Sequence, residues 1–181
     1  MTAIANNFAT AIRANAESVK EKNKARADKL VLLVNDKACH ALLKASKVDA
    51  ERFANRALYA TEKCVKIVYA ASREVVSHDD LNENAFATIK TLINALDAKV
   101  NVTKRDIEAA LSIDVKHDEK RAFVYRRKAR LSAATLSAQS QQCVDMIKTL
   151  KIAREVATNV FEVQDNALMQ HFKKQFADIA L

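Results

Sequence analysis

The side chains best suited to chemistry in this chain are basic, and seven of them lie within residues 116–130. They are Lys116, Lys120, Arg121, Arg126, Arg127, Lys128 and Arg130. Asp118 and Glu119 are the acidic residues there, and Phe123 and Tyr125 lie between the basic groups. Lysine and arginine neutralise phosphates, and aromatic rings stack on bases, so this pattern is typical of contact with nucleic acid. The same residues would suit an acidic protein partner.

Histidine and aspartate give a second, weaker chemical hypothesis. His40, the pair His78-Asp79 and the pair His117-Asp118 are the residue types that an all-α, metal-dependent phosphohydrolase of the HD type places around a divalent metal. The four histidines show no common metal-ligand spacing, and an aspartate at a helix end is also an ordinary cap. Such an enzyme is therefore a remote alternative. The sequence predicts no catalytic residues, no metal and no other cofactor.

Three cysteines, Cys39, Cys64 and Cys143, lie far apart, each on an otherwise apolar helical stripe. Their odd number and the lack of a secretory signal predict reduced, buried thiols in an intracellular setting, either the cytoplasm or the inside of a viral particle. The longest aliphatic run, residues 30–34, is far shorter than the roughly 20 residues that cross a bilayer. The sequence thus predicts a chain that is neither secreted nor transmembrane.

The chain has 181 residues and contains neither Gly nor Pro. Glycine supplies the backbone of tight turns, so β-rich folds would be difficult to build from this composition. The lack of glycine also excludes Walker loops, dinucleotide-binding fingerprints and nucleophile elbows. The predicted fold class is therefore all-α.

Apolar residues at steps of three and four predict two long helices, at about 2–45 and 115–163, in an elongated bundle. Shorter helices are expected between them at about 50–76, 81–99 and 104–111, with Asp49 and Thr103 as N-caps and residues 77–80 as a link. Residues 1–181 would form one domain. Residues 165–181 would be either its last part or a separate C-terminal amphipathic helix.

Residues 131–144 carry no charge, in contrast to the basic segment that precedes them. A helix with no charge on any face indicates one surrounded by neighbours, although an ordinary neutral face on a monomer remains the alternative. The residues expected at an oligomer interface are Leu131, Ala133, Leu136, Ser140, Cys143 and Ile147.

These features together favour a non-enzymatic structural or interaction protein that self-associates by helix packing, as a homo-oligomer or in a multi-protein assembly. The Ala-rich, mildly basic composition resembles that of helical proteins used as structural or internal components of viral particles, close to nucleic acid. The alternative is a nucleic-acid-binding regulatory protein that uses the basic segment. Membrane contact is not expected, since the apolar stripes are narrow and Trp is absent. No small-molecule substrate is predicted.

Overall fold

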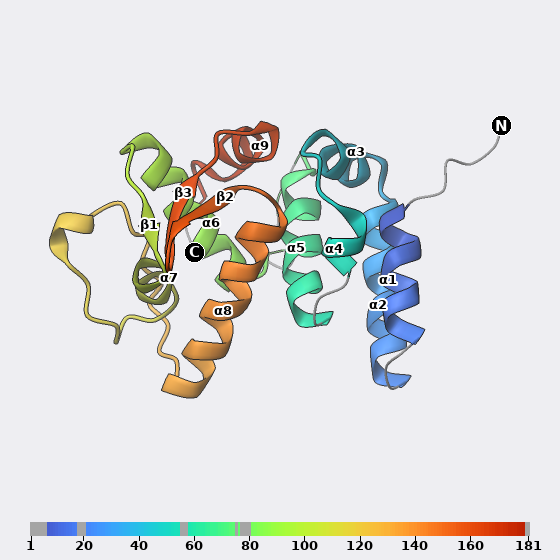
Figure 1. Ribbon diagram of the computed structural model, residues 1–181, viewed down its shortest axis with the longest axis horizontal. Helices are drawn as coiled ribbons and strands as arrows, with labels where there is room; N and C mark the ends of the chain where they lie inside the picture. The colour runs from blue at the N-terminus through green and yellow to red at the C-terminus, as the bar shows by residue number, and fades with distance from the viewer. Residues whose placement is uncertain (1–6, 18–20, 55–57, 75, 77–80, 180–181) are drawn as a thin grey trace.

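The computed structural model describes residues 7–17, 21–54, 58–74, 76 and 81–179, and this part of the chain is mostly helical (Figure 1). Its helices are α1 Asn7–Glu17, α2 Glu21–Asn35, α3 Lys37–Ala45, α4 Ala50–Ala54, α5 Leu58–Ala71, α6 Glu83–Asp97, α7 Lys104–Leu111, α8 Ala133–Thr149 and α9 Ala167–Phe176, with a short 3-10 turn, η2, at Glu119–Arg121. Three short strands, β1 Val102–Thr103, β2 Ala153–Ala157 and β3 Val160–Val163, form a small sheet. The fold class is therefore helical in the main, but it is not strictly all-α.

The long helix predicted over residues 2–45 is wrong. In its place α1 and α2 lie side by side at one end of the molecule, and α3 follows in a new direction (Figure 1). The Asp36 carboxylate ends α2 and caps α3, since its Oδ1 accepts from the N–H groups of Ala38 and Cys39, each at 3.0 Å. Folding back lets the apolar faces of α1 and α2 bury Phe8, Ile12 and Leu30, which a single extended helix would leave in water.

The middle of the chain agrees better with the sequence. The predicted break before residue 50 is confirmed, because the Asp49 carboxylate accepts from the Arg52 N–H at 2.7 Å as α4 begins. The predicted capped helix after Thr103 is confirmed as α7. Thr103 and Asp106 form a reciprocal capping box at its start. The expected link at residues 77–80 lies outside the described residues.

The second predicted long helix, over residues 115–163, is also wrong. The chain first runs through an irregular segment at residues 112–132, then forms α8, and then turns into the β2–β3 hairpin. The sheet order is β1-β3-β2 with both pairs antiparallel, and a bulge interrupts β2 between Glu155 and Ala157. The hairpin forms without glycine because Asn159 takes the left-handed conformation, with φ of 59°.

Three lysines take the position after a helix that glycine usually fills. Lys47, Lys99 and Lys151 have φ of 52°, 55° and 56° and follow α3, α6 and α8. In each case the next residue, Val48, Val100 or Ile152, donates its N–H back to a carbonyl five residues earlier, which is the Schellman pattern. Helices thus end cleanly in a chain that has no glycine.

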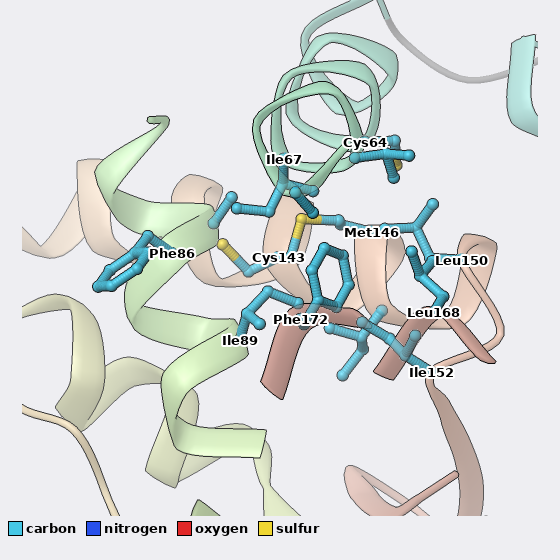
Figure 2. Close-up of a cluster of buried hydrophobic side chains, with 14 of the residues drawn as sticks. Cys64, Ile67, Phe86, Ile89, Cys143, Met146, Leu150, Ile152, Leu168 and Phe172 are labelled. Carbon is cyan, nitrogen blue, oxygen red and sulfur yellow. The ribbon is translucent and has the colours of Figure 1, made fainter. Parts of the chain in front are cut away.

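The core of the molecule lies where α5, α6, α8 and α9 meet (Figure 2). Fully buried side chains there include Ile67 from α5, Phe86 and Ile89 from α6, Met146 from α8 and Phe172 from α9. The buried residues of α1 to α4 join the same hydrophobic cluster. Among the described helices, none is both long and apolar enough to cross a membrane.

Candidate functional site

The basic residues predicted to contact nucleic acid lie on the irregular segment, which contains the short η2 turn but no α-helix, and three of them turn inward. Arg121 is the first: its Nε and a terminal nitrogen donate to the two carboxylate oxygens of Asp106, each at 2.5 Å. The same guanidinium donates to the Asn101 carbonyl at 2.9 Å and lies 4.8 Å from the Phe123 ring centre. These contacts fasten η2 to the start of α7.

The side chains of Arg126 and Arg127 also bind groups within the chain. Arg126 donates to the carbonyls of Ile113 and Val115, at 2.7 and 2.9 Å. Arg127 donates to Asn84 and pairs with Glu83 at the start of α6, and its side chain is 15% exposed. A guanidinium that already holds two partners and is largely buried is poorly placed to grip a phosphate. The bonds of Arg127 instead attach the irregular segment to α6.

The remaining basic residues of the segment, Lys116, Lys120, Lys128 and Arg130, are exposed. Arg130 lies 3.7 Å from an Asp114 oxygen, but its side chain is 80% exposed, so this contact is weak. Within the described part of the chain, no acidic group pairs with the three lysines. These four side chains are the ones that remain for an anionic partner.

The residues predicted at an oligomer interface separate into two groups. Ser140, Cys143 and Ile147 are buried in the chain's own core, where a second copy cannot contact them. Leu131 and Leu136 are partly buried against the same core, and Ala133 is exposed. On the opposite side of α8, Asp145 and Lys148 occupy the second half of the helix, and the first half presents a solvent-facing patch without charge. It consists of Ala133, Ala134, Ser137, Ala138 and Gln141, which we call the neutral face.

A polar network that the sequence did not reveal crosses the core beside α8. Arg127 binds Asn84 Oδ1, Asn84 Nδ2 donates to Gln139 Oε1 at 2.9 Å, and Lys63 Nζ donates to the same oxygen at 2.8 Å. Lys63 is only 5% exposed, although its neighbour in this bond is a neutral amide. The signal for its burial is the mostly apolar stretch at residues 64–71 of α5, which only Lys66 interrupts, since a helix that is apolar on most sides is buried.

Burial changes the acidity of two groups in this network. Loss of hydration lowers the pKa of the Lys63 ammonium, with nearby Cys143 and Glu62 opposing that effect. Burial raises the pKa of the Cys143 thiol, which the Thr88 hydroxyl and Lys63 partly offset. Functional sites often contain a lysine whose pKa is lowered by burial.

Among the described residues, the two histidine positions of the HD-type hypothesis, His40 and His117, lie far apart. His40 lies in α3, where its ring meets Phe8 edge-on with centres 6.0 Å apart, while His117 precedes η2 on the other side of the molecule (Figure 1). Asp118 caps η2 by accepting from the Lys120 N–H at 3.0 Å. His78 and Asp79 lie outside the described residues. Over the ranges that the structure describes, no group of three or more His, Cys, Asp or Glu side chains is arranged to hold a metal ion.

Comparison with known proteins identifies no relative of this chain. No protein-family model, no curated protein and no solved structure matches this chain. Its function must therefore be inferred from its own residues.

Proposed function

We propose that this chain is a non-enzymatic interaction protein that self-associates through the neutral face of α8, as one component of a larger assembly. The observation that carries the proposal is an exposed helical face of five residues with no charge among them. Surface helices of soluble proteins ordinarily place charged residues opposite the core. The interior of protein interfaces is, by contrast, depleted in charge.

The geometry of α8 favours a helix as the partner. Ala133, Ser137 and Gln141 follow one another at four-residue steps, with Ala134 and Ala138 beside them, so all five share one side of the helix. Small side chains allow two helix axes to approach to about 8 Å, the short end of the usual range. The side opposite this face is anchored in the core by Cys143 and Ile147.

A further exposed apolar residue is bonded to the segment that leads into α8. Ile113 is 44% exposed, and its N–H donates to the Ala129 carbonyl at 2.9 Å, four residues before the helix begins. The exposed Lys128 and Arg130 flank Ala129 in this segment. A partner that reaches from the neutral face to this segment would meet these cations, and acidic side chains on the partner would complement them.

The test is the solution mass of the whole chain, measured by light scattering at low and high salt. The double substitution Ala134→Lys with Ala138→Lys places two charges on the neutral face without entering the core. The wild-type chain is expected to exceed the 20.1 kDa of one protomer at both salt concentrations, and the variant is expected to return to it.

A matched control is available on α3, where Ala41 and Ala45 are also exposed and four residues apart. Ala41→Lys with Ala45→Lys adds the same charge elsewhere and is expected to leave the oligomer intact. A wild-type chain that is monomeric at both salt concentrations would refute the proposal. Equal loss of mass in both double variants would show that added charge, and not the α8 face, was responsible.

Nucleic-acid contact is a second candidate, favoured by the four basic side chains that face solvent on residues 116–130. Lys116→Glu with Lys128→Glu should then weaken binding to a fluorescent DNA oligonucleotide and reduce its salt dependence. Lys37→Glu with Lys44→Glu, two exposed lysines of α3, should have much less effect. If both double variants bind alike, the basic segment is not the contact.

A further inference from the structure

A pocket of about 420 Å³ lies beside the buried Lys63. Arg26 of α2, Lys63 and Glu62 of α5, Asn82 before α6 and Gln139 of α8 line it. Its volume is within the usual range for small-molecule sites. Its two lining residues on α8, Gln139 and Gln142, are not part of the neutral face, and Gln139 is on the side of the helix that faces α5.

The pocket wall presents hydrogen-bond donors that lack a protein acceptor. Lys63 Nζ has three N–H groups, of which one donates to Gln139 Oε1 at 2.8 Å. That oxygen also accepts from Asn84 at 2.9 Å, so the Gln139 amide has only its Nε2 donors left to offer. Asn82 Oδ1 is likewise occupied by the Ala85 N–H at 3.1 Å. In the part of the chain that is described, the remaining donors of these three side chains reach no acceptor.

The pocket lining also carries more positive than negative charge. Glu62, the one carboxylate among the lining residues described, is shared by two cations: Arg26 Nε at 3.0 Å and Lys66 Nζ at 2.8 Å. Arg26 also lies over the Tyr59 ring, 4.6 Å from its centre. Lys63 therefore has no carboxylate of its own. A buried ammonium that is held only by an amide is costly to fold, and a bound anion would remove that cost.

We propose that this pocket binds a small molecule bearing a carboxylate or phosphate group, whose oxygens accept hydrogen bonds from Lys63 Nζ, Gln139 Nε2 and Asn82 Nδ2. Carboxylates and phosphates are acceptor-rich and anionic. They would therefore supply hydrogen-bond acceptors for the unused donors and a negative charge for the Lys63 ammonium. The proposal is independent of self-association through α8. The lowered pKa of Lys63 agrees with it, because a bound anion would favour the charged form and raise that pKa again.

The experiment is isothermal titration calorimetry of the full chain with inorganic phosphate and with succinate, at constant ionic strength and pH 7. Saturable binding of at least one probe is expected, and the tighter probe identifies the class. Lys63→Met removes the ammonium and keeps an unbranched apolar side chain, so the affinity should fall about tenfold or more. Lys174→Met, at an exposed lysine of α9, is the matched control and should bind as the wild type does.

A second variant guards against a folding defect in the first. Gln139→Glu keeps the shape of the side chain and gives Lys63 a carboxylate inside the protein, so it should abolish probe binding while preserving the fold. Failure of both probes to bind the wild type would overturn the proposal. It would also be overturned if Lys63→Met and Gln139→Glu bound either probe as tightly as the wild type.

Discussion

The guanidinium of Arg121 holds both carboxylate oxygens of Asp106, at 2.5 Å each, across fifteen residues of sequence. Asp106 is only 2% exposed and also caps α7 together with Thr103. One buried carboxylate thus fixes the start of a helix and the irregular segment that covers it. Arg121 is consequently a structural residue, although the sequence groups it with the phosphate-binding candidates.

Arg121→Met is expected to lower the free energy of unfolding by about 1.5–3 kcal/mol, the usual effect of losing hydrogen bonds to a charged group. Lys120→Met changes the neighbouring residue, which is exposed in the same turn, and should have little effect. Urea denaturation of the two variants provides the comparison. Equal stability of the two variants would contradict the structural role of Arg121.

Arg127 and Arg130 form a second contrasting pair, three residues apart. The Arg127 side chain is 15% exposed and bound to Asn84 and Glu83, while that of Arg130 is 80% exposed. Arg127→Met should loosen the end of the irregular segment that leads into α8, because Asn94 and Thr91 of α6 hold the segment only further back, at Phe123 and Tyr125. The Ile113 N–H, which donates to the Ala129 carbonyl, should then exchange with deuterium much faster. Arg130→Met should leave that exchange rate unchanged, and similar rates in the two variants would argue against the assignment.

The lysines with positive φ predict a gain in stability. A side chain in the left-handed region costs roughly 1–2 kcal/mol relative to glycine, part of which is offset by the greater freedom of glycine in the unfolded chain. Lys99→Gly, at φ of 55° after α6, should therefore raise the free energy of unfolding by up to about 1 kcal/mol. Lys44→Gly, within α3, should lower it by about 1 kcal/mol. A loss of stability in Lys99→Gly would show that its backbone is not strained.

The buried Lys63 predicts a particular dependence of stability on pH. Its pKa in the folded chain is lowered below its ordinary value of 10.5 by burial, so between those two values the unfolded chain binds more protons. Stability should therefore rise with pH across that window. Lys63→Met lacks this contribution, so the wild type should gain stability relative to the variant as the pH approaches 10.5. Urea denaturation across that range tests it, and a constant difference would contradict it.

The sequence correctly predicted the mainly helical fold class and the helix starts that depend on local caps. The Thr103 cap and the α7 helix that follows it could be predicted because a capping box uses residues only three apart. The two predicted long helices were wrong for a different reason. A repeating apolar stripe is the same whether a helix continues or folds back as α1 and α2 do, so periodicity alone cannot place the break.

The missed strands and the missed site depend on tertiary structure. Residues 153–163 continue the apolar stripe of α8, and the absence of glycine concealed a turn that Asn159 makes possible. Lys63 is held by Gln139, which lies 76 residues away in the sequence, so only the folded chain brings them together. The inward arginines were misassigned because composition does not reveal whether a charge faces solvent or a partner within the chain.

The most direct test of the central claim is the distance between α8 helices in two copies of the chain. Ser137→Cys offers an exposed labelling site on the neutral face. The native thiols of Cys39, Cys64 and Cys143 are buried, and burial raises the pKa of Cys39 to about 12, so spin label should attach only at residue 137. Pulsed electron paramagnetic resonance should show one narrow intermolecular distance that disappears on dilution with unlabelled chain. A signal from isolated labels alone would mean that this face has no second copy against it.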